Sequence, residues 1–178
     1  MRDSWIQAGH ALFAEKGPAG LKIEILARQV GKSKSSFYHH FADIEVFTEW
    51  LLSYHMERVQ RIADLERQCP RVVPDLLRLL ITVEEDLLFN RQLRSHRTVT
   101  AFRKCIETTN REIAKAILPT WAGAFGLADR PEVARLMLNL VIDNFYLQLT
   151  NQTLTYEWLL NYISELRSMV RGMATMDV

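Results

Sequence analysis

The chain has 178 residues, of which 48% are hydrophobic and 24% charged, and its formal net charge is +1 at pH 7. This is the composition of a globular protein, and the near-zero charge excludes a histone-like polycation and an acidic disordered tail. A transmembrane helix needs about 20 mostly apolar residues. The longest uncharged runs, 116–128 and 144–156, are shorter and contain Asn, Gln, Thr or Gly, so we expect no membrane partner.

The N-terminal residues and the cysteines predict a cytoplasmic location. The sequence begins without an apolar segment followed by a small-residue cleavage site, which a secretory signal would require. Cys69 and Cys105 form no C-x-x-C pair, so their spacing predicts neither a disulfide framework nor a structural zinc site. We expect no cofactor and no metal.

Apolar residues recur at helical spacing between the glycine and proline positions. Ile23, Leu26, Ala27 and Val30, for example, lie at i, i+3, i+4 and i+7, the pattern of one buried helix face. No segment shows sustained period-two alternation or an Asn-Gly or Asp-Gly hairpin signal. The sequence therefore predicts an all-α fold with helices at 3–16, 22–30, 33–41, 43–66, 72–89, 91–98, 100–118, 131–150 and 154–171, and a loop at 119–130.

The predicted helices change in length along the chain. Three short ones occupy the first 45 or so residues, and longer ones follow. This asymmetry predicts a small N-terminal head, residues 1–45, and a larger helical-bundle body, residues 46–178.

Residues 22–41 have the layout of a helix-turn-helix unit, in which the second helix enters the major groove of DNA. Gly31 suits the left-handed position after the first helix, and Ser33 is a good N-cap for the second. At 100° per residue, Phe37 and Phe41 point inward. Ser35 and His39 then point outward, where hydroxyl and imidazole groups reach phosphates or base edges.

Charge alone gives this unit only modest support. Residues 1–50 contain six basic and six acidic side chains, and the positive charge is confined to the turn and second helix. Lys22, at the start of the first helix, is unfavourable there unless a phosphate docks beside it. A solvated helical hairpin with no DNA-binding role is the alternative.

The run 31–41, Gly-Lys-Ser-Lys-Ser-Ser-Phe-Tyr-His-His-Phe, resembles the signature of the TetR family of transcriptional regulators. Residues 12–17 resemble the end of that family's first helix, and Ile23, Leu26 and Ala27 match its second. The resemblance covers roughly residues 5–52. The sequence departs from the family at Lys22, where threonine is usual, at Ile25, where a polar residue is common, and at Ile44, where a lysine is usual.

The resemblance implies a non-enzymatic, homodimeric repressor that places two heads in adjacent major grooves of double-stranded DNA and is released by a small-molecule effector. The positions that would contact DNA are Lys22, Lys34, Ser35, Ser36, Tyr38, His39 and His40. The alternative, favoured by the uncharged head and by Ile44, is a helical dimerisation or ligand-carrier module that has lost DNA binding.

Two C-terminal segments predict a dimer interface. The segment 131–150 is apolar on more than one face, so one face is expected against its own core and another against a partner. With the stripe on 154–171 it would form a four-helix seam that includes Leu136, Leu140, Leu147, Leu159, Ile163, Leu166 and Val170. Asp143 and Asn144 would set the register of this seam or contact a ligand, and a monomeric bundle core is the alternative.

The resemblance also implies an effector pocket inside the body. Its candidate lining residues are Trp50, Tyr54, Phe89, Phe102, Cys105 and Trp121. Aromatic residues at helical spacing are more often ordinary core, so a packed interior remains the alternative.

No catalytic motif is present, which argues against an enzyme. The acidic run Glu84-Glu85-Asp86 lacks the Glu-x-x-His motif of di-iron bundles. His55 and His96 are expected at the surface, and Cys105 is expected to be a buried, inert thiol.

Overall fold

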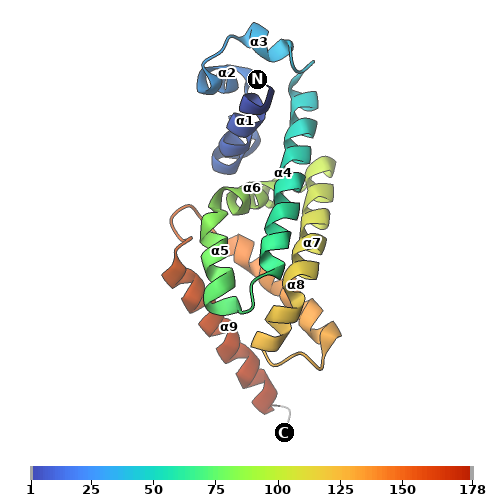
Figure 1. Ribbon diagram of the computed structural model, residues 1–178, viewed down its shortest axis with the longest axis vertical. Helices are drawn as coiled ribbons and strands as arrows, with labels where there is room; N and C mark the ends of the chain where they lie inside the picture. Colours follow the sequence, from blue (N-terminus) through green and yellow to red (C-terminus); the bar gives the residue numbers. More distant parts are fainter. Residues whose placement is uncertain (1, 177–178) are drawn as a thin grey trace. The chain divides into compact units, whose positions relative to one another are not determined.

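The computed structural model describes residues 2–176, and the regular structure in this range is entirely helical (Figure 1). The nine α-helices are α1 (Arg2–Lys16), α2 (Ile23–Val30), α3 (Lys34–Tyr38), α4 (Ile44–Arg67), α5 (Leu77–Thr82), α6 (Glu84–Ser95), α7 (Thr100–Ala124), α8 (Pro131–Gln148) and α9 (Tyr156–Met176). A 3₁₀ turn, η1 (Gly17–Gly20), and a π-helical turn, η2 (Val72–Leu76), complete the set. The predicted all-α fold is confirmed.

The chain forms two compact units. The first unit comprises Met1–Arg61 and Glu85–Thr109, and the second comprises Ile62–Glu84 and Asn110–Val178. The functional boundary between residues 45 and 46 stays a prediction. Residue 1 and residues 177–178, at the outer ends of the two predicted domains, lie outside the described part of the chain.

An aromatic cluster of the first unit packs α1 and the segment of α3 against the start of α4. Trp5, Phe37, Phe41 and Phe47 are buried, with ring centroids 4.9–5.5 Å apart. Gly9 allows this packing, because a Cβ atom there would lie 2.5 Å from the Phe47 ring. Burial of such rings contributes roughly 1.5–3 kcal/mol each, so this cluster fixes the position of α3.

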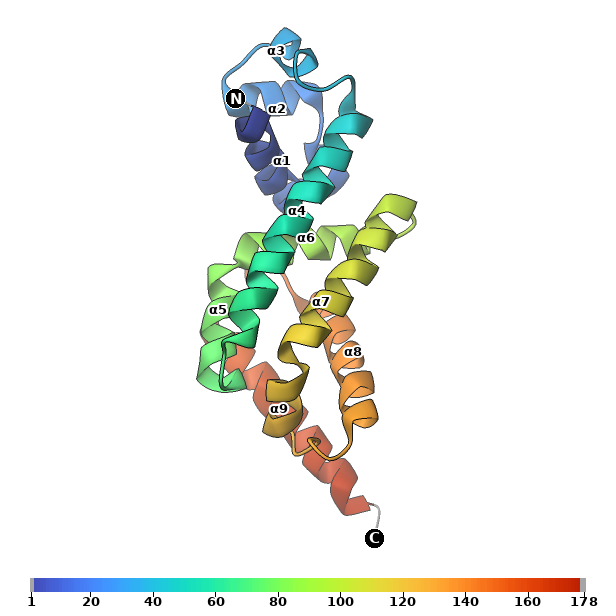
Figure 2. The same ribbon diagram turned by 45° about the vertical axis from the view of Figure 1, so that its right-hand side comes forward.

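In Figure 2 the helix α6 crosses α4. A second aromatic cluster of the same unit joins α6 to α1 and α7. Phe89 of α6 lies 4.3 Å from Phe13 of α1, centroid to centroid, and Phe13 lies 5.5 Å from Phe102 of α7. All three side chains are buried. The C-terminal part of α1 is therefore packed against α6 and α7.

The second unit is built on α5, α8, α9 and the C-terminal part of α7. Leu138 of α8 and Leu159 of α9 are almost fully buried, and α5 packs on α9. Trp121 stacks on Phe125 at 4.4 Å near the end of α7. No helix within residues 2–176 has the length and apolarity that crossing a membrane demands.

Predicted helix boundaries were wrong around α5, α6 and α7. The predicted helix 72–89 is interrupted at Val83, which separates α5 from α6. The helix α6 then continues through the predicted break to Ser95. The helix α7 passes through Pro119 and ends at Ala124, where a loop had been predicted from 119 onward.

Candidate functional site

The turn between α2 and α3 has the predicted helix-turn-helix geometry. Gly31 adopts φ +68°, and its N–H lies 3.2 Å from the Arg28 carbonyl oxygen. Ser33 caps α3, because its Oγ accepts a hydrogen bond of 3.3 Å from the Ser36 N–H. A left-handed glycine and a serine N-cap together allow the chain to end one helix and begin the next within three residues.

The helix α3 and the turn after it separate an apolar face from a polar face, as the helical projection predicted. Phe37 and Phe41 are buried in the aromatic cluster, whereas Ser35 and His39 are exposed. Tyr38 is 56% exposed, although it is aromatic. The outer face therefore offers hydroxyl, phenol and imidazole groups, which hydrogen-bond to phosphate oxygens and base edges.

All seven predicted DNA-contacting residues are at least partly exposed. Lys22, Lys34, Ser35, Tyr38 and His39 are exposed, and Ser36 and His40 are half-buried. The helix α3 is shorter than the predicted 33–41, so His39 and His40 lie in the turn that follows it. Helical hydrogen bonding nevertheless continues to the Phe41 N–H, 3.0 Å from the Phe37 carbonyl oxygen. The contacts of these seven residues with DNA stay predictions.

One of these residues is already paired within the head. The Lys34 ammonium donates a hydrogen bond of 2.6 Å to Glu24 Oε1 on α2. This bond raises the pKa of Lys34 above its usual value and lowers the pKa of Glu24. Both side chains are exposed, so DNA phosphates would compete with Glu24 for the lysine.

The helix α4 begins directly after Asp43, which acts as its N-cap. The Val46 N–H donates a hydrogen bond of 2.8 Å to Asp43 Oδ1, which caps the helix. Ile44 is half-buried and offers no charge to a phosphate. This end of α4 therefore lacks a cation at position 44, and the Asp43 carboxylate already occupies the N-terminus of the helix.

The six predicted effector-lining residues are not gathered around one cavity. Trp50 and Tyr54 line a hollow of about 360 Å³ between α1 and α4, and the Arg2 guanidinium lies 4.0 Å from the Trp50 ring centroid. Phe89, Phe102 and Cys105 are buried in the first unit, and Trp121 is buried in the second. Burial raises the pKa of Cys105 to about 11, as expected for an inert thiol.

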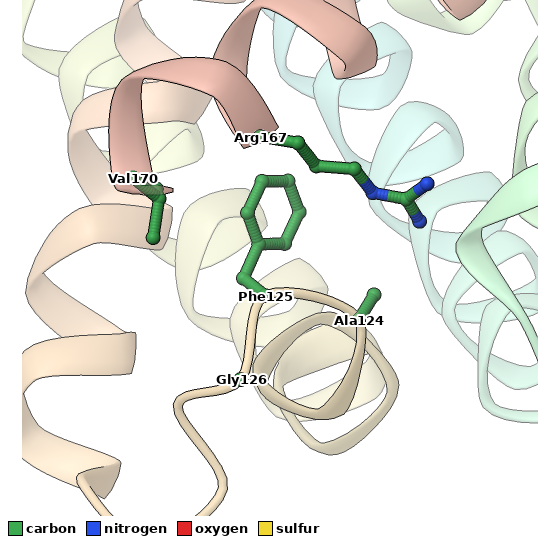
Figure 3. Close-up of a pocket in the computed structure, with 5 residues that line it drawn as sticks. All are labelled: Ala124, Phe125, Gly126, Arg167 and Val170. Carbon is green, nitrogen blue, oxygen red and sulfur yellow. The ribbon is translucent and has the colours of Figure 1, made fainter. Parts of the chain in front are cut away.

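A larger pocket, of about 520 Å³, lies in the second unit and was missed by the sequence analysis (Figure 3). Its lining residues are Ala124, Phe125, Gly126, Arg167 and Val170. The Arg167 guanidinium carbon lies 6.0 Å from the Phe125 ring centroid, and the buried Arg167 Nε has no hydrogen-bond partner. The sequence signal for this pocket was weak: Arg167 lies between the apolar residues Leu166 and Val170 on one helix.

Exposed leucines follow one stripe of α8. Leu136, Leu140 and Leu147 are 63%, 64% and 83% exposed. Exposed apolar side chains in a contiguous patch are typical of interaction surfaces, and the role of these leucines in a dimer interface stays a prediction. Asn144, on the same helix, is paired within the chain, because its Oδ1 accepts from Gln148 and lies 3.1 Å from the Tyr162 hydroxyl.

The predicted contributions of α9 differ in exposure. Leu159 and Ile163 are buried in their own unit, and their part in a dimer interface stays a prediction. Leu166 and Val170 are half-buried. The accessible part of the predicted seam is therefore centred on α8.

The prediction of a surface position for His55 was wrong. His55 is fully buried on α4, together with His10 of α1 and Asp86 of α6. His10 was not singled out in the sequence, and the residues of this group are far apart in the chain. Only the fold brings them together, so spacing carried no signal.

This geometry is that of a helix-turn-helix unit. Residues 6–47 match the family model described as bacterial regulatory proteins, tetR family. The resemblance to TetR-family transcriptional regulators is thereby confirmed. No curated protein sequence matches the chain.

Two solved structures share the fold over nearly the whole chain, and both are assigned to TetR-family transcriptional regulators. The one from Mesorhizobium loti MAFF303099 is 17% identical, with 97% of this chain and 95% of that chain covered and a TM-score of 0.57. The one from Rhodococcus sp. is 21% identical, with 98% and 96% covered and a TM-score of 0.54. These likenesses extend the similarity of fold beyond the head to the helical body.

Proposed function

We propose that the protein is a homodimeric transcriptional repressor that binds a palindromic operator and is released by a small-molecule effector. The observation that carries the proposal is the polar outer face of α3, exposed above a rigid aromatic cluster in a domain that matches the TetR-family model. A helix held in this way can enter a major groove without reorganising its own support.

The small side chains at the start of α3 favour close approach to DNA. Ser35 and Ser36 leave room for base edges, while Tyr38 and His39 extend further and donate hydrogen bonds. In a symmetric dimer the two copies of α3 would need to lie about 34–36 Å apart to enter successive major grooves. The operator would then share the two-fold symmetry of the protein.

Selection from a random duplex library, followed by fluorescence anisotropy on the enriched sequence, tests the DNA-binding function. We expect a palindrome and an affinity that falls steeply with salt. The double variant Tyr38→Ala/His39→Ala should weaken binding at least about tenfold. The control Tyr156→Ala, an exposed tyrosine of α9, should bind as the wild type does.

Two results would contradict this function. Enrichment of no sequence would favour a dimerisation or carrier module, and unchanged affinity in the double variant would show that α3 is not the DNA-binding element. Repression is tested separately, by a reporter gene placed behind the selected palindrome. Reporter activation in place of silencing would overturn the repressor assignment.

The effector belongs in the pocket between the end of α7 and α9. Arg167 supplies a positive charge beside the apolar wall of Phe125 (Figure 3), a combination that suits a small aromatic or aliphatic carboxylate. Ligand entry should change the fluorescence of Trp121, which is stacked on Phe125.

Benzoate and its neutral analogue benzamide form the test pair for this pocket. Benzoate should quench Trp121 and lower DNA affinity, and benzamide should do so more weakly. Arg167→Gln should remove the difference between the two compounds, whereas Arg135→Gln, an exposed arginine of α8, should not. Equal responses of the wild type to both compounds would exclude Arg167 as an anion-binding residue.

A further inference from the structure

Three buried side chains of the first unit point their ligand atoms at one another. They come from three helices: His10 from α1, His55 from α4 and Asp86 from α6. The two histidine side chains are completely buried, and that of Asp86 is 3% exposed. His10 Nε2 lies 3.1 Å from His55 Nδ1, and Asp86 Oδ1 lies 3.6 Å and 3.8 Å from these two nitrogens.

These distances match those between the ligands of a small metal ion. A circle through the three atoms has a radius of about 2.0 Å. Zinc binds histidine nitrogen at about 2.0–2.1 Å and carboxylate oxygen at about 2.0–2.2 Å. An ion near the centre of the triangle would thus reach all three atoms without movement of a helix.

From this geometry we propose that His10, His55 and Asp86 form a binding site for a divalent first-row transition-metal ion such as Zn²⁺. Two imidazoles and one carboxylate favour zinc and its neighbours over Mg²⁺ and Ca²⁺, which prefer oxygen ligands. The site would be structural, because it is buried and the three helices that supply it are packed together.

The surroundings of His10 match those of a metal-bound histidine. Its second nitrogen, Nδ1, lies 2.5 Å from Glu85 Oε1. Metal-binding histidines commonly donate their other N–H to a carboxylate, which fixes the tautomer and strengthens the ligand. Glu85 would therefore hold His10 with Nε2 free to coordinate.

Two carboxylates and one guanidinium surround the group. Glu85 lies beside His10, and Arg58 pairs with Asp86. When these three side chains are ionised they carry a formal sum of −1, so no net positive charge of their own opposes a cation there.

A hydrogen-bond network without metal is the competing account of the same residues. The two histidines lie within hydrogen-bonding distance, and Arg58 donates to both oxygens of Asp86 at 2.6 Å. An ion would replace the proton shared between the imidazoles and would compete with Arg58 Nε for Asp86 Oδ1. Arg58 could retain its bond to Asp86 Oδ2. The two accounts therefore differ in whether Asp86 Oδ1 faces the Arg58 Nε–H or a metal ion.

Wild-type protein, stripped with a chelator, provides the decisive test. Co²⁺ should give visible ligand-field absorption that saturates at one ion per chain and is displaced by Zn²⁺. In ¹⁵N-histidine NMR spectra, Zn²⁺ should shift His10 Nε2 and His55 Nδ1. It should leave His96, and the neighbours His39 and His40 in the turn after α3, unshifted.

Matched variants assign the site. His55→Gln should weaken Zn²⁺ binding at least tenfold, whereas His96→Gln and the surface variant His39→Gln/His40→Gln should not. Since a change in the core can prevent folding, the wild-type NMR shifts decide the matter if His55→Gln does not fold. Absence of Co²⁺ absorption, or shifts confined to His39 and His40, would overturn the proposal and leave the hydrogen-bond network.

Discussion

Gly31 holds a backbone conformation on which the whole helix-turn-helix unit depends. Its φ of +68° is left-handed, and a Cβ atom there would meet nothing within 4 Å. The cost of Gly31→Ala is therefore backbone strain alone, about 1–2 kcal/mol. Denaturant unfolding should show this loss, and Gly31→Asn should lose less, because asparagine tolerates the left-handed region better than alanine.

A second glycine provides the control for this prediction. A Cβ atom at Gly123, inside α7, would also meet nothing within 4 Å, but its φ is not left-handed. Gly123→Ala should therefore stabilise the protein by roughly 0.5–1 kcal/mol, the ordinary preference for alanine in a helix. The strain argument fails if both substitutions change stability in the same direction.

Glu66 of α4 makes the stability of the protein depend on pH. It is 3% exposed and its Oε2 has no hydrogen-bond partner, and burial raises its pKa from 4.5 to about 8. The unfolded chain loses this proton near pH 4.5, whereas the folded chain keeps it until about pH 8. The stabilising contribution is therefore complete below pH 4.5 and is lost as pH rises toward 8.

Substitution of Glu66 isolates this contribution. Glu66→Gln should raise the free energy of unfolding at pH 8 by up to a few kcal/mol and change it much less at pH 4. Urea unfolding measured across this range should show the difference. Glu49→Gln, an exposed position on the same helix, should leave the pH profile unchanged, and a Glu66 variant with the wild-type profile would show that Glu66 is ionised in the folded protein.

Among the elements, α2 is expected to limit the affinity of α3 for DNA. Glu24 pairs with Lys34 and places a negative charge beside the proposed phosphate contact. Glu24→Gln should tighten DNA binding about 2–10-fold and steepen the dependence on salt by up to one ion, because Lys34 becomes free to neutralise a phosphate. Anisotropy titrations at several salt concentrations would measure both effects.

An ion pair elsewhere in the head controls for net charge. Glu15 and Lys16 form an exposed pair at the end of α1, away from the helix-turn-helix unit. Glu15→Gln changes the net charge of the chain by the same amount but should alter affinity only slightly. Equal gains in the two variants would show that overall charge, and not release of Lys34, determines the binding.

Local signals account for the elements that the sequence predicted well. Gly31, Ser33 and Asp43 specify helix ends through backbone angle and capping, and the structure has ends at each of them. The break at Val83 has no glycine or proline to mark it. Pro119 was expected to end α7, but buried Ile117 and Trp121 on either side of it hold the helix together, and packing outweighs the lost hydrogen bond.

At the scale of the molecule, a site formed by one short segment can be predicted from the sequence, whereas a site assembled from distant segments cannot. The outward face of α3 follows from helical periodicity within eleven residues, so its orientation could be predicted. The pocket at Arg167 and the group around His55 are assembled from helices far apart in sequence. No spacing rule connects their members, and each requires the three-dimensional structure.

The exposed stripe on α8 predicts how the whole molecule assembles. Leu140→Glu would place a charge at the centre of the proposed seam, which costs several kcal/mol when it is buried without a partner. We expect the wild type to be a dimer and this variant a folded monomer by light scattering at micromolar concentration. The monomeric variant should bind the palindrome much more weakly than the dimeric wild type does. Leu65→Glu, an exposed leucine of α4, should remain dimeric. A wild type that stays monomeric, or a Leu140 variant that stays dimeric, would place the partner surface elsewhere, and DNA binding through paired heads would then need another two-fold contact.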